Sequence, residues 1–160
     1  QIMPQLTKIF GEYEVFSVEE QLYEEVKDSD TGYNFKGFID LVIRTSDGKF
    51  HIIDWKTCSW GWDAKKRSDK YITYQLTLYK KFWCQKYDID PKLVETHFAL
   101  LKRTAKKDNV EIFRVTSGPR KVENATKLLT TALIHISKQN HVKDRRSCQG
   151  CEFYKTEHCK

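Results

Sequence analysis

The chain has 160 residues, of which 39% are hydrophobic and 13% aromatic, a composition that excludes an intrinsically disordered protein. This length is sufficient for one domain with its own core. No run approaches the roughly 20 apolar residues that a membrane helix needs, and the segment from Gln1 to Phe10 lacks the apolar stretch of a signal peptide. The formal net charge of +6 suits a polyanionic partner.

The spacing of apolar residues indicates five strands and two helices. An Asp-Gly pair within residues 45–48 predicts a hairpin turn, so the strands on either side should pair antiparallel. The polar stretches 20–34 and 60–70 are expected to be irregular connections. We expect strands at residues 12–19, 35–44, 49–57, 93–101 and 110–115, and helices at about residues 69–87 and 120–139. This order predicts an α/β domain with a mixed sheet over residues 1–140, followed by a cysteine-rich tail over 141–160.

Two carboxylates and one lysine are placed to share a site. Asp40 and Asp54 each lie in an apolar strand, where a carboxylate costs free energy unless it is paired or binds a cation. The hairpin brings the two strands together, and Lys56, two residues after Asp54, projects from the same face. Carboxylate oxygens of this kind bind Mg²⁺, which activates water for attack on a phosphodiester. The alternative is an internal salt bridge that only closes the sheet.

These residues resemble a known nuclease signature. The sequence Gly37-Phe38-Ile39-Asp40, followed after 13 residues by Asp54-Trp55-Lys56, resembles the PD-(D/E)XK nuclease superfamily, and within it the RecB-like exonuclease branch. That branch also carries a Q-x-x-x-Y motif on the next helix, which Gln75 and Tyr79 match, one helical turn apart. The resemblance implies a restriction-endonuclease-like fold, a mixed β-sheet flanked by helices.

The resemblance also implies a role for each residue of the motifs. Asp40, Asp54 and the backbone carbonyl of Trp55 would bind Mg²⁺ or Mn²⁺, and Lys56 would be the catalytic lysine. Gln75 and Tyr79 would line the site and help to place the DNA strand. Members of the branch usually add a His or Glu from a helix that precedes the sheet. The sequence indicates no such helix, so we expect this ligand upstream of Gln1, with Glu19 or Glu20 as the alternative.

Five cysteines are present, and three of them, Cys148, Cys151 and Cys159, lie in the last thirteen residues. An odd count with a C-x-x-C pair indicates a metal or cluster site in a reducing, cytoplasmic compartment more than a disulfide framework. Some RecB-like nucleases, including helicase-associated and CRISPR-adaptation types, bind a 4Fe-4S cluster with three such cysteines and a fourth before the core. A Zn²⁺ site completed by His158 and a tail of unligated thiols remain alternatives.

Basic and aromatic residues follow the candidate site directly. Lys65, Lys66 and Arg67 come after two tryptophans, and aromatics among basic residues can stack on bases and neutralise phosphates. The alternative is a solvated loop. We therefore predict a metal-dependent DNA nuclease, most simply an exonuclease acting on single strands or free ends in recombination, repair or CRISPR adaptation. A helicase is the kind of protein partner that the resemblance suggests. A non-cleaving nucleic-acid-binding module and a structural cluster domain of a recombination assembly are the alternatives.

Overall fold

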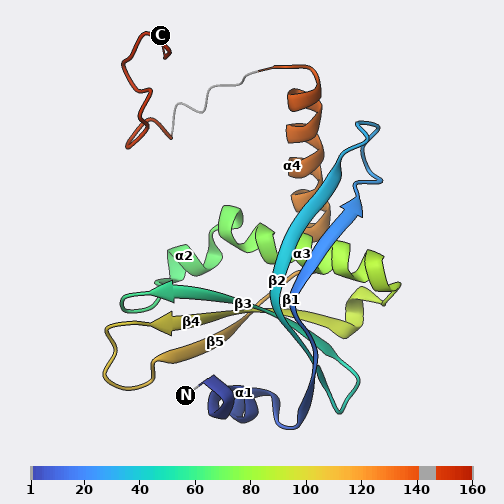
Figure 1. Ribbon diagram of the computed structural model, residues 1–160, viewed down its shortest axis with the longest axis vertical. Coiled ribbons are helices and arrows are strands. Elements are labelled where there is room, and N and C mark those ends of the chain that lie inside the picture. Colours follow the sequence, from blue (N-terminus) through green and yellow to red (C-terminus); the bar gives the residue numbers. More distant parts are fainter. Residues whose placement is uncertain (1, 141–146, 160) are drawn as a thin grey trace.

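The computed structural model describes residues 2–140 and 147–159, in which one five-stranded sheet lies between helices (Figure 1). The helices are α1 (Ile2–Phe10), α2 (Ala64–Ser68), α3 (Lys70–Tyr87) and α4 (Pro119–Ser137), with a short 3₁₀ turn at Pro91–Leu93. The strands are β1 (Tyr13–Glu25), β2 (Asn34–Thr45), β3 (Phe50–Cys58), β4 (Val94–Lys102) and β5 (Val110–Val115). The predicted mixed sheet flanked by helices is confirmed.

The strands lie in chain order, β1-β2-β3-β4-β5, and only the β3–β4 pair among them is parallel. A parallel pair needs a long crossover connection, which α2 and α3 supply between β3 and β4. The β2–β3 turn is the predicted hairpin: Gly48 has a φ of 80°, and its N–H donates to the Thr45 carbonyl at 2.9 Å. The two strands that carry the candidate site are therefore joined by local turn chemistry.

Two apolar layers form the core, one on each face of the sheet. The larger layer lies between the sheet and α3, where Leu76, Phe82 and Trp83 pack on Ile52 and Phe98 with no exposed surface. The smaller layer lies under α1 on the opposite face, as Figure 1 shows. Its buried residues are Leu6, Leu41, Ile43, Ile53 and Ala99. Each face of β3 is therefore covered by a helix.

The prediction that residues 20–34 are irregular is wrong for residues 20–25, because β1 continues to Glu25, whereas residues 26–33 form the connection to β2. This part of β1 pairs with β2 from Glu20 opposite Ile39 to Glu25 opposite Asn34. Glu20 and Leu22 are the buried positions of this part of β1, and a glutamate at an inward position hides the apolar alternation in the sequence. The structure therefore contains a long β1–β2 ribbon where the sequence suggested a loop.

Two short helices were also missed. The expectation that no helix precedes the first strand is wrong, because α1 spans Ile2–Phe10. A nine-residue helix is marginal by itself, and α1 is stabilised by packing Leu6 and Phe10 against the sheet. The connection 60–70 contains α2, capped by the Asp63 side chain, which accepts from the Lys66 N–H at 2.7 Å.

The cysteine-rich tail is described from residue 147 to residue 159 and consists of turns. The predicted boundary between residues 140 and 141 adjoins positions 141–146, which lie outside the described residues. The division into two domains therefore stays a prediction. Within the described part of the chain, no helix combines the length and apolar character needed to cross a bilayer.

Candidate active site

Asp54 is the most deeply buried ionisable residue of the predicted site, with 2% of its surface exposed. It lies on β3, which is buried from Phe50 through Asp54 because a strand and a helix cover it on every side. The β2–β3 ladder ends at Leu41 opposite Ile53. Extending this register by one residue places Asp40 opposite Asp54, as the hairpin predicted.

Lys56 and Gln75 hold the two oxygens of Asp54. The Lys56 Nζ atom lies 2.6 Å from Oδ2, and the Gln75 amide donates to Oδ1 at 3.2 Å. The Oδ2 atom is buried, and the Lys56 ammonium is its neighbour of opposite charge. An ionised carboxylate has about four lone-pair sites on its two oxygens, so Asp54 can still bind a cation.

Asp40 lies beside this pair and is half-buried. Its Oδ2 atom accepts a hydrogen bond from the backbone N–H of Trp55 at 2.7 Å, which fixes the carboxylate against β3. Burial raises the pKa of Asp54, the Lys56 ammonium opposes this change, and the negative charge of Asp40 adds to it. Two carboxylates facing one ammonium leave a net negative charge, and a divalent cation neutralises it.

Gln75 and Tyr79 lie on α3 and face the carboxylates. The Gln75 amide donates to the Tyr79 hydroxyl at 3.0 Å as well as to Asp54. Tyr79 is only 7% exposed and its ring lies in the larger apolar layer. The Q-x-x-x-Y pair therefore connects the core under α3 to the carboxylate of β3, and it orients that carboxylate.

The close approach of Tyr79 to Gly37 explains why the first motif begins with a glycine. A Cβ atom at this position would lie 2.7 Å from the Cε1 atom of Tyr79 and 3.2 Å from that of Phe35. The missing side chain allows the Tyr79 ring to pack directly on β2. The sequence motif includes this glycine, but its steric role depends on the position of α3, which the motif alone does not give.

The expected extra His or Glu ligand is not supplied by α1, whose nine residues include neither type. Glu20 is engaged elsewhere: its carboxylate accepts from Trp83 Nε1 at 3.1 Å, from Lys86 Nζ at 2.8 Å and from the Ser17 hydroxyl. Burial disfavours the charged form of Glu20, but these hydrogen bonds outweigh it and lower the pKa of its carboxyl. Glu20 therefore holds β1 to α3.

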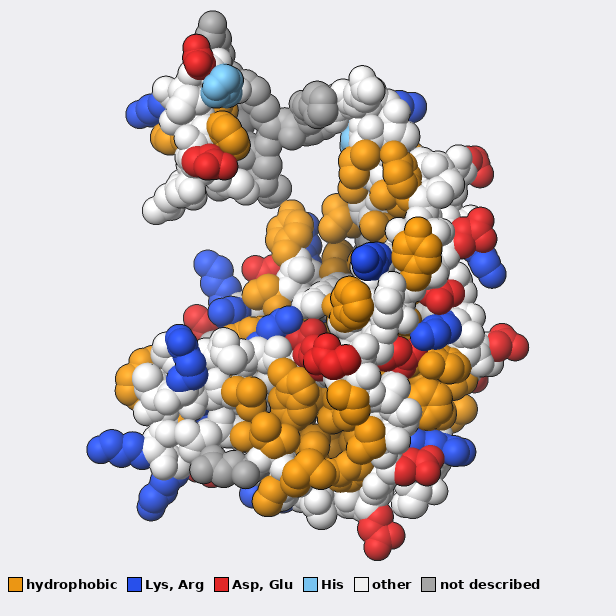
Figure 2. Space-filling view, in the orientation of Figure 1, with side chains coloured by type: hydrophobic (Ala, Val, Ile, Leu, Met, Phe, Trp, Pro, Cys, Tyr) orange, Lys and Arg blue, Asp and Glu red, His pale blue; other side chains and the backbone are white. Residues whose placement is uncertain are grey.

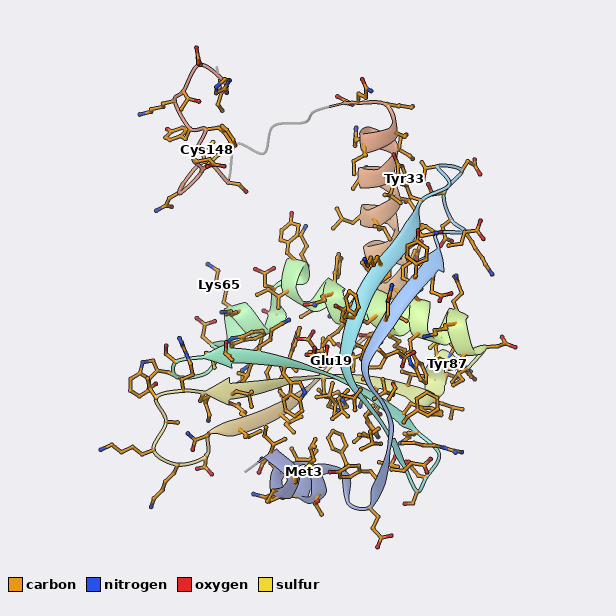
Figure 3. The ribbon with its side chains drawn as sticks, viewed as in Figure 1. Met3, Glu19, Tyr33, Lys65, Tyr87 and Cys148 are labelled. Carbon is orange, nitrogen blue, oxygen red and sulfur yellow. The ribbon has the colours of Figure 1, made fainter. Side chains whose placement is uncertain are left out.

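Glu19 is exposed and adopts a φ of 50°, an uncommon backbone conformation for a residue other than glycine. The β1–β2 register, with Val18 opposite Leu41 and Glu20 opposite Ile39, places it across from Asp40. Figure 2 shows acidic side chains gathered at the centre of this face, and Figure 3 labels Glu19 in that region. Of the two glutamates, Glu19 is the one left free to reach toward the candidate site.

The predicted nucleic-acid-binding residues lie on α2. Lys65 and Lys66 are exposed, and Figure 3 shows Lys65 projecting from this helix. Arg67 is held within the protein, because it donates to Glu111 at 2.5 Å and to the Trp62 carbonyl at 2.8 Å. Trp62 is buried in the core, whereas Trp60 is 79% exposed. Only part of this basic and aromatic segment is therefore available to a ligand.

The three tail cysteines are free thiols, with Cys151 exposed and Cys148 and Cys159 half-buried. The Cys151 N–H donates to the Cys148 carbonyl at 3.2 Å, so the C-x-x-C pair forms a turn (Figure 3). Within residues 2–140 and 147–159, the three thiols do not form a group with ligand atoms within 4.8 Å of one another. Cys84 is buried, which raises the pKa of its thiol to about 11, and it packs as an apolar residue.

Comparisons with known proteins bear on the same features. The family model described as the PD-(D/E)XK nuclease superfamily matches residues 4–156. No curated protein shows a significant match. The crystal structure of SSO0001 is similar with a TM-score of 0.54 at 17% identity, over 95% of this chain and 63% of that one. A provisionally assigned exonuclease of Eubacterium rectale has a TM-score of 0.57 at 14% identity, over 92% of this chain and 53% of that one.

These two likenesses show the fold alone, which is restriction-endonuclease-like, with a mixed sheet flanked by helices. The chain spans less than two thirds of the length of either structure. The roles of Asp40, Asp54, Lys56, Gln75 and Tyr79 therefore depend on the geometry described above.

Substitution Gly37→Ala is expected to displace the Tyr79 ring, because the new methyl group would overlap it. Overpacking of this kind costs about 1–3 kcal/mol, and it would also move the Gln75 amide away from Asp54. The measurement is thermal unfolding together with binding of Mn²⁺. Gly118→Ala is the control, since a Cβ there meets nothing within 4 Å. Unchanged Mn²⁺ affinity in Gly37→Ala would show that Tyr79 does not position the site.

Proposed function

Because the chain belongs to the PD-(D/E)XK nuclease superfamily, we propose that it is a divalent-metal-dependent deoxyribonuclease of the RecB-like exonuclease type. The observation that carries the proposal is the buried Asp54 carboxylate, held between Lys56 and Gln75 and opposite Asp40. A DNA substrate with free ends or single strands, and a role in recombination, repair or CRISPR adaptation, belong to this proposal. They rest on the likeness of the three motifs to that branch.

Asp40 and Asp54, with the Trp55 carbonyl, are the residues that would hold the metal. Hard oxygen ligands of this kind suit Mg²⁺ and Mn²⁺. The Asp54 carboxylate is buried, and the Trp55 N–H fixes the Asp40 carboxylate through its Oδ2 atom, so the two groups are held in place next to each other. The bound metal supplies charge neutralisation at the phosphodiester and lowers the pKa of a water molecule.

The protein's own side chains orient the reacting groups. Lys56 keeps 32% of its side chain exposed, so its ammonium can reach a phosphate at the site. There it stabilises the negative charge that develops on the phosphate oxygens and orients the attacking water. Gln75 and Tyr79 keep Asp54 in one rotamer, so that the carboxylate is in place before the substrate binds.

The basic segment on α2 would contact the DNA backbone. Lys65 and Lys66 are free to bind phosphates, and the exposed Trp60 offers a ring on which a base can stack. Arg67 contributes by anchoring α2 through Glu111. Figure 2 shows lysine and arginine side chains on the side of the molecule where α2 lies, beside the central acidic group. DNA would thus be held next to the carboxylates.

Substitution Lys56→Ala is expected to lower cleavage of labelled DNA in Mg²⁺ or Mn²⁺ by at least about 100-fold, the usual cost of removing one charge-stabilising group. Single-stranded and double-stranded substrates are compared, and a chelator should abolish cleavage of both. Lys127→Ala is the matched control, because Lys127 is an exposed lysine on α4. Wild-type protein that cuts no faster than Lys56→Ala contradicts the proposal. DNA binding without cleavage would then favour a non-cleaving binding module.

The tail would add an iron–sulfur cluster bound by Cys148, Cys151 and Cys159, and Zn²⁺ is the other candidate ligand. A helicase is the expected kind of protein partner. Supporting the cluster or metal site is the free state of all three thiols and the C-x-x-C turn. Protein purified without oxygen should be brown, with visible absorbance and bound iron that Cys151→Ser abolishes. Cys58→Ser is the control. Colourless protein that contains neither iron nor zinc would show that the thiols are unligated.

A further inference from the structure

A second polar cluster lies on the face of the sheet opposite Asp54. It consists of His51 on β3 and Glu95 and His97 on β4, and one ligand atom from each lies within 4.8 Å of the other two. The parallel register places His51 beside Glu95, with His97 two residues further along β4. Side chains alternate along a strand, so these residues share the face of Ile53 and Ala99, under α1. The cluster is therefore separate from the candidate active site.

The two histidines leave polar nitrogens without partners inside the protein. His51 is 7% exposed and His97 is 5% exposed, and the Nδ1 atom of each ring is buried without a hydrogen bond. Buried polar atoms almost always have partners, and leaving one unpaired costs about 1–3 kcal/mol. Two such atoms in one place indicate a missing ligand more strongly than either would by itself.

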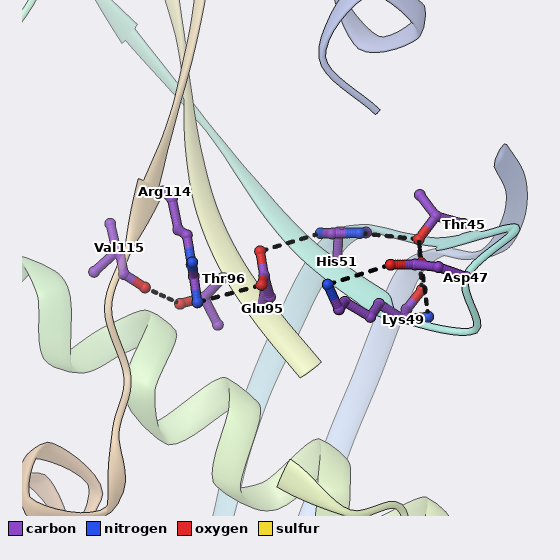
Figure 4. A network of polar contacts seen from close by, with 8 residues as sticks. All are labelled: Thr45, Asp47, Lys49, His51, Glu95, Thr96, Arg114 and Val115. Carbon is purple, nitrogen blue, oxygen red and sulfur yellow. Dashed lines mark hydrogen bonds and ion pairs between the residues drawn. The ribbon is translucent and has the colours of Figure 1, made fainter. Parts of the chain in front are cut away.

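The hydrogen bonds around His51 favour one of the two tautomers of its ring. Its Nε2 atom lies 3.2 Å from the Thr45 hydroxyl, whose own proton is donated to Asp47 at 2.5 Å (Figure 4). With that proton on Asp47, the Thr45 oxygen is free to accept from Nε2–H. In the neutral ring, Nδ1 then carries a lone pair and no proton. A metal-binding histidine is commonly oriented in this way by a partner on its other nitrogen.

Glu95 faces that lone pair with an oxygen of its own. Its Oε1 atom lies 3.2 Å from Arg114, whereas Oε2 lies 3.9 Å from the His51 Nδ1 atom, as Figure 4 shows. Two acceptors facing each other repel unless a proton or a cation lies between them. Burial lowers the pKa of both His51 and His97, which disfavours a proton as the bridge. A cation bound between these atoms would satisfy both of them.

We propose that His51, Glu95 and His97 form a structural binding site for a divalent transition metal, with Zn²⁺ as the best fit. Two imidazoles and one carboxylate are ligands that Zn²⁺ accepts, with water in the fourth position, whereas Mg²⁺ prefers oxygen ligands only. Because the ligand atoms are within 4.8 Å of one another, small side-chain rotations bring them to the roughly 2 Å metal distances of such a site.

The ion would couple α1 to the sheet. The ring of Phe10, the last residue of α1, lies 4.7 Å from the His51 ring and 5.1 Å from the His97 ring, between centroids. Metal binding would hold both imidazoles in the orientation on which Phe10 packs. The site would therefore stabilise the fold by binding the native state, with no part in cleavage.

The test is a calorimetric titration with Zn²⁺ in excess Mg²⁺, combined with thermal unfolding. The full chain carries Cys148→Ser, Cys151→Ser and Cys159→Ser, so that tail thiols do not bind the metal. We expect one Zn²⁺ per chain and a higher unfolding temperature. His51→Gln and His97→Gln should each weaken binding by at least about 10-fold, the loss that even outer partners of a metal cause. His135→Gln, a half-buried histidine on α4, is the control.

Absence of stoichiometric binding would overturn the proposal, as would equal Zn²⁺ affinity in the His51→Gln, His97→Gln and control proteins. Should a histidine variant fail to fold without metal, Glu95→Gln decides, because its side chain is 19% exposed and the amide has nearly the same shape. A loss of affinity in Glu95→Gln supports the site, and an unchanged affinity contradicts it. The His51, His97 and Glu95 variants leave Asp40 and Asp54 unchanged, so failure here is distinguishable from failure of the proposed nuclease function.

Discussion

The contact between the Lys56 ammonium and the buried Asp54 carboxylate is the interaction on which the candidate site depends. A carboxylate that is 2% exposed carries a desolvation penalty of several kcal/mol, which neighbouring positive charge and hydrogen bonds must offset. Lys56 supplies the charge from the same strand at 2.6 Å, and Gln75 supplies a donor from α3. Asp40 adds negative charge to the same place, so the protein by itself is one positive charge short. This deficit is the physical reason to expect a divalent cation.

The fold separates two polar clusters by the thickness of one sheet. On the α3 face, Asp54 lies near the Asp40 carboxylate and against the Lys56 ammonium, groups that suit a hard cation and a phosphodiester. On the α1 face, His51 and His97 present imidazole nitrogens under Phe10, which suit a softer ion. Alternation along β3 is what divides them, since consecutive side chains point to opposite faces. One strand can therefore contribute to a reactive site and to a structural site without either interfering with the other.

Features set by local chemistry were predictable from the sequence, and features set by tertiary contacts were not. The Asp-Gly turn at Gly48 acts within a few residues, and the structure has it. The inward Glu20 could not be anticipated, because its partner Trp83 lies 63 residues away. The helix α1 is stabilised by tertiary contacts with the sheet, and the local sequence does not indicate these contacts. The pairing of His51 with Glu95 depends on a parallel register that only the crossover through α3 determines.

The central claim is that Asp40 and Asp54 together bind a divalent cation, and anomalous X-ray scattering from crystals soaked in Mn²⁺ tests it most directly. The account predicts one strong anomalous peak between the Asp40 and Asp54 carboxylates, at about 2 Å from an oxygen of each, as expected for this class of ion. Lys56 would at the same time move off Asp54 Oδ2 to make room for the metal. An absence of anomalous density there, with the Lys56–Asp54 contact unchanged, would contradict the account and leave the trio as an internal salt bridge.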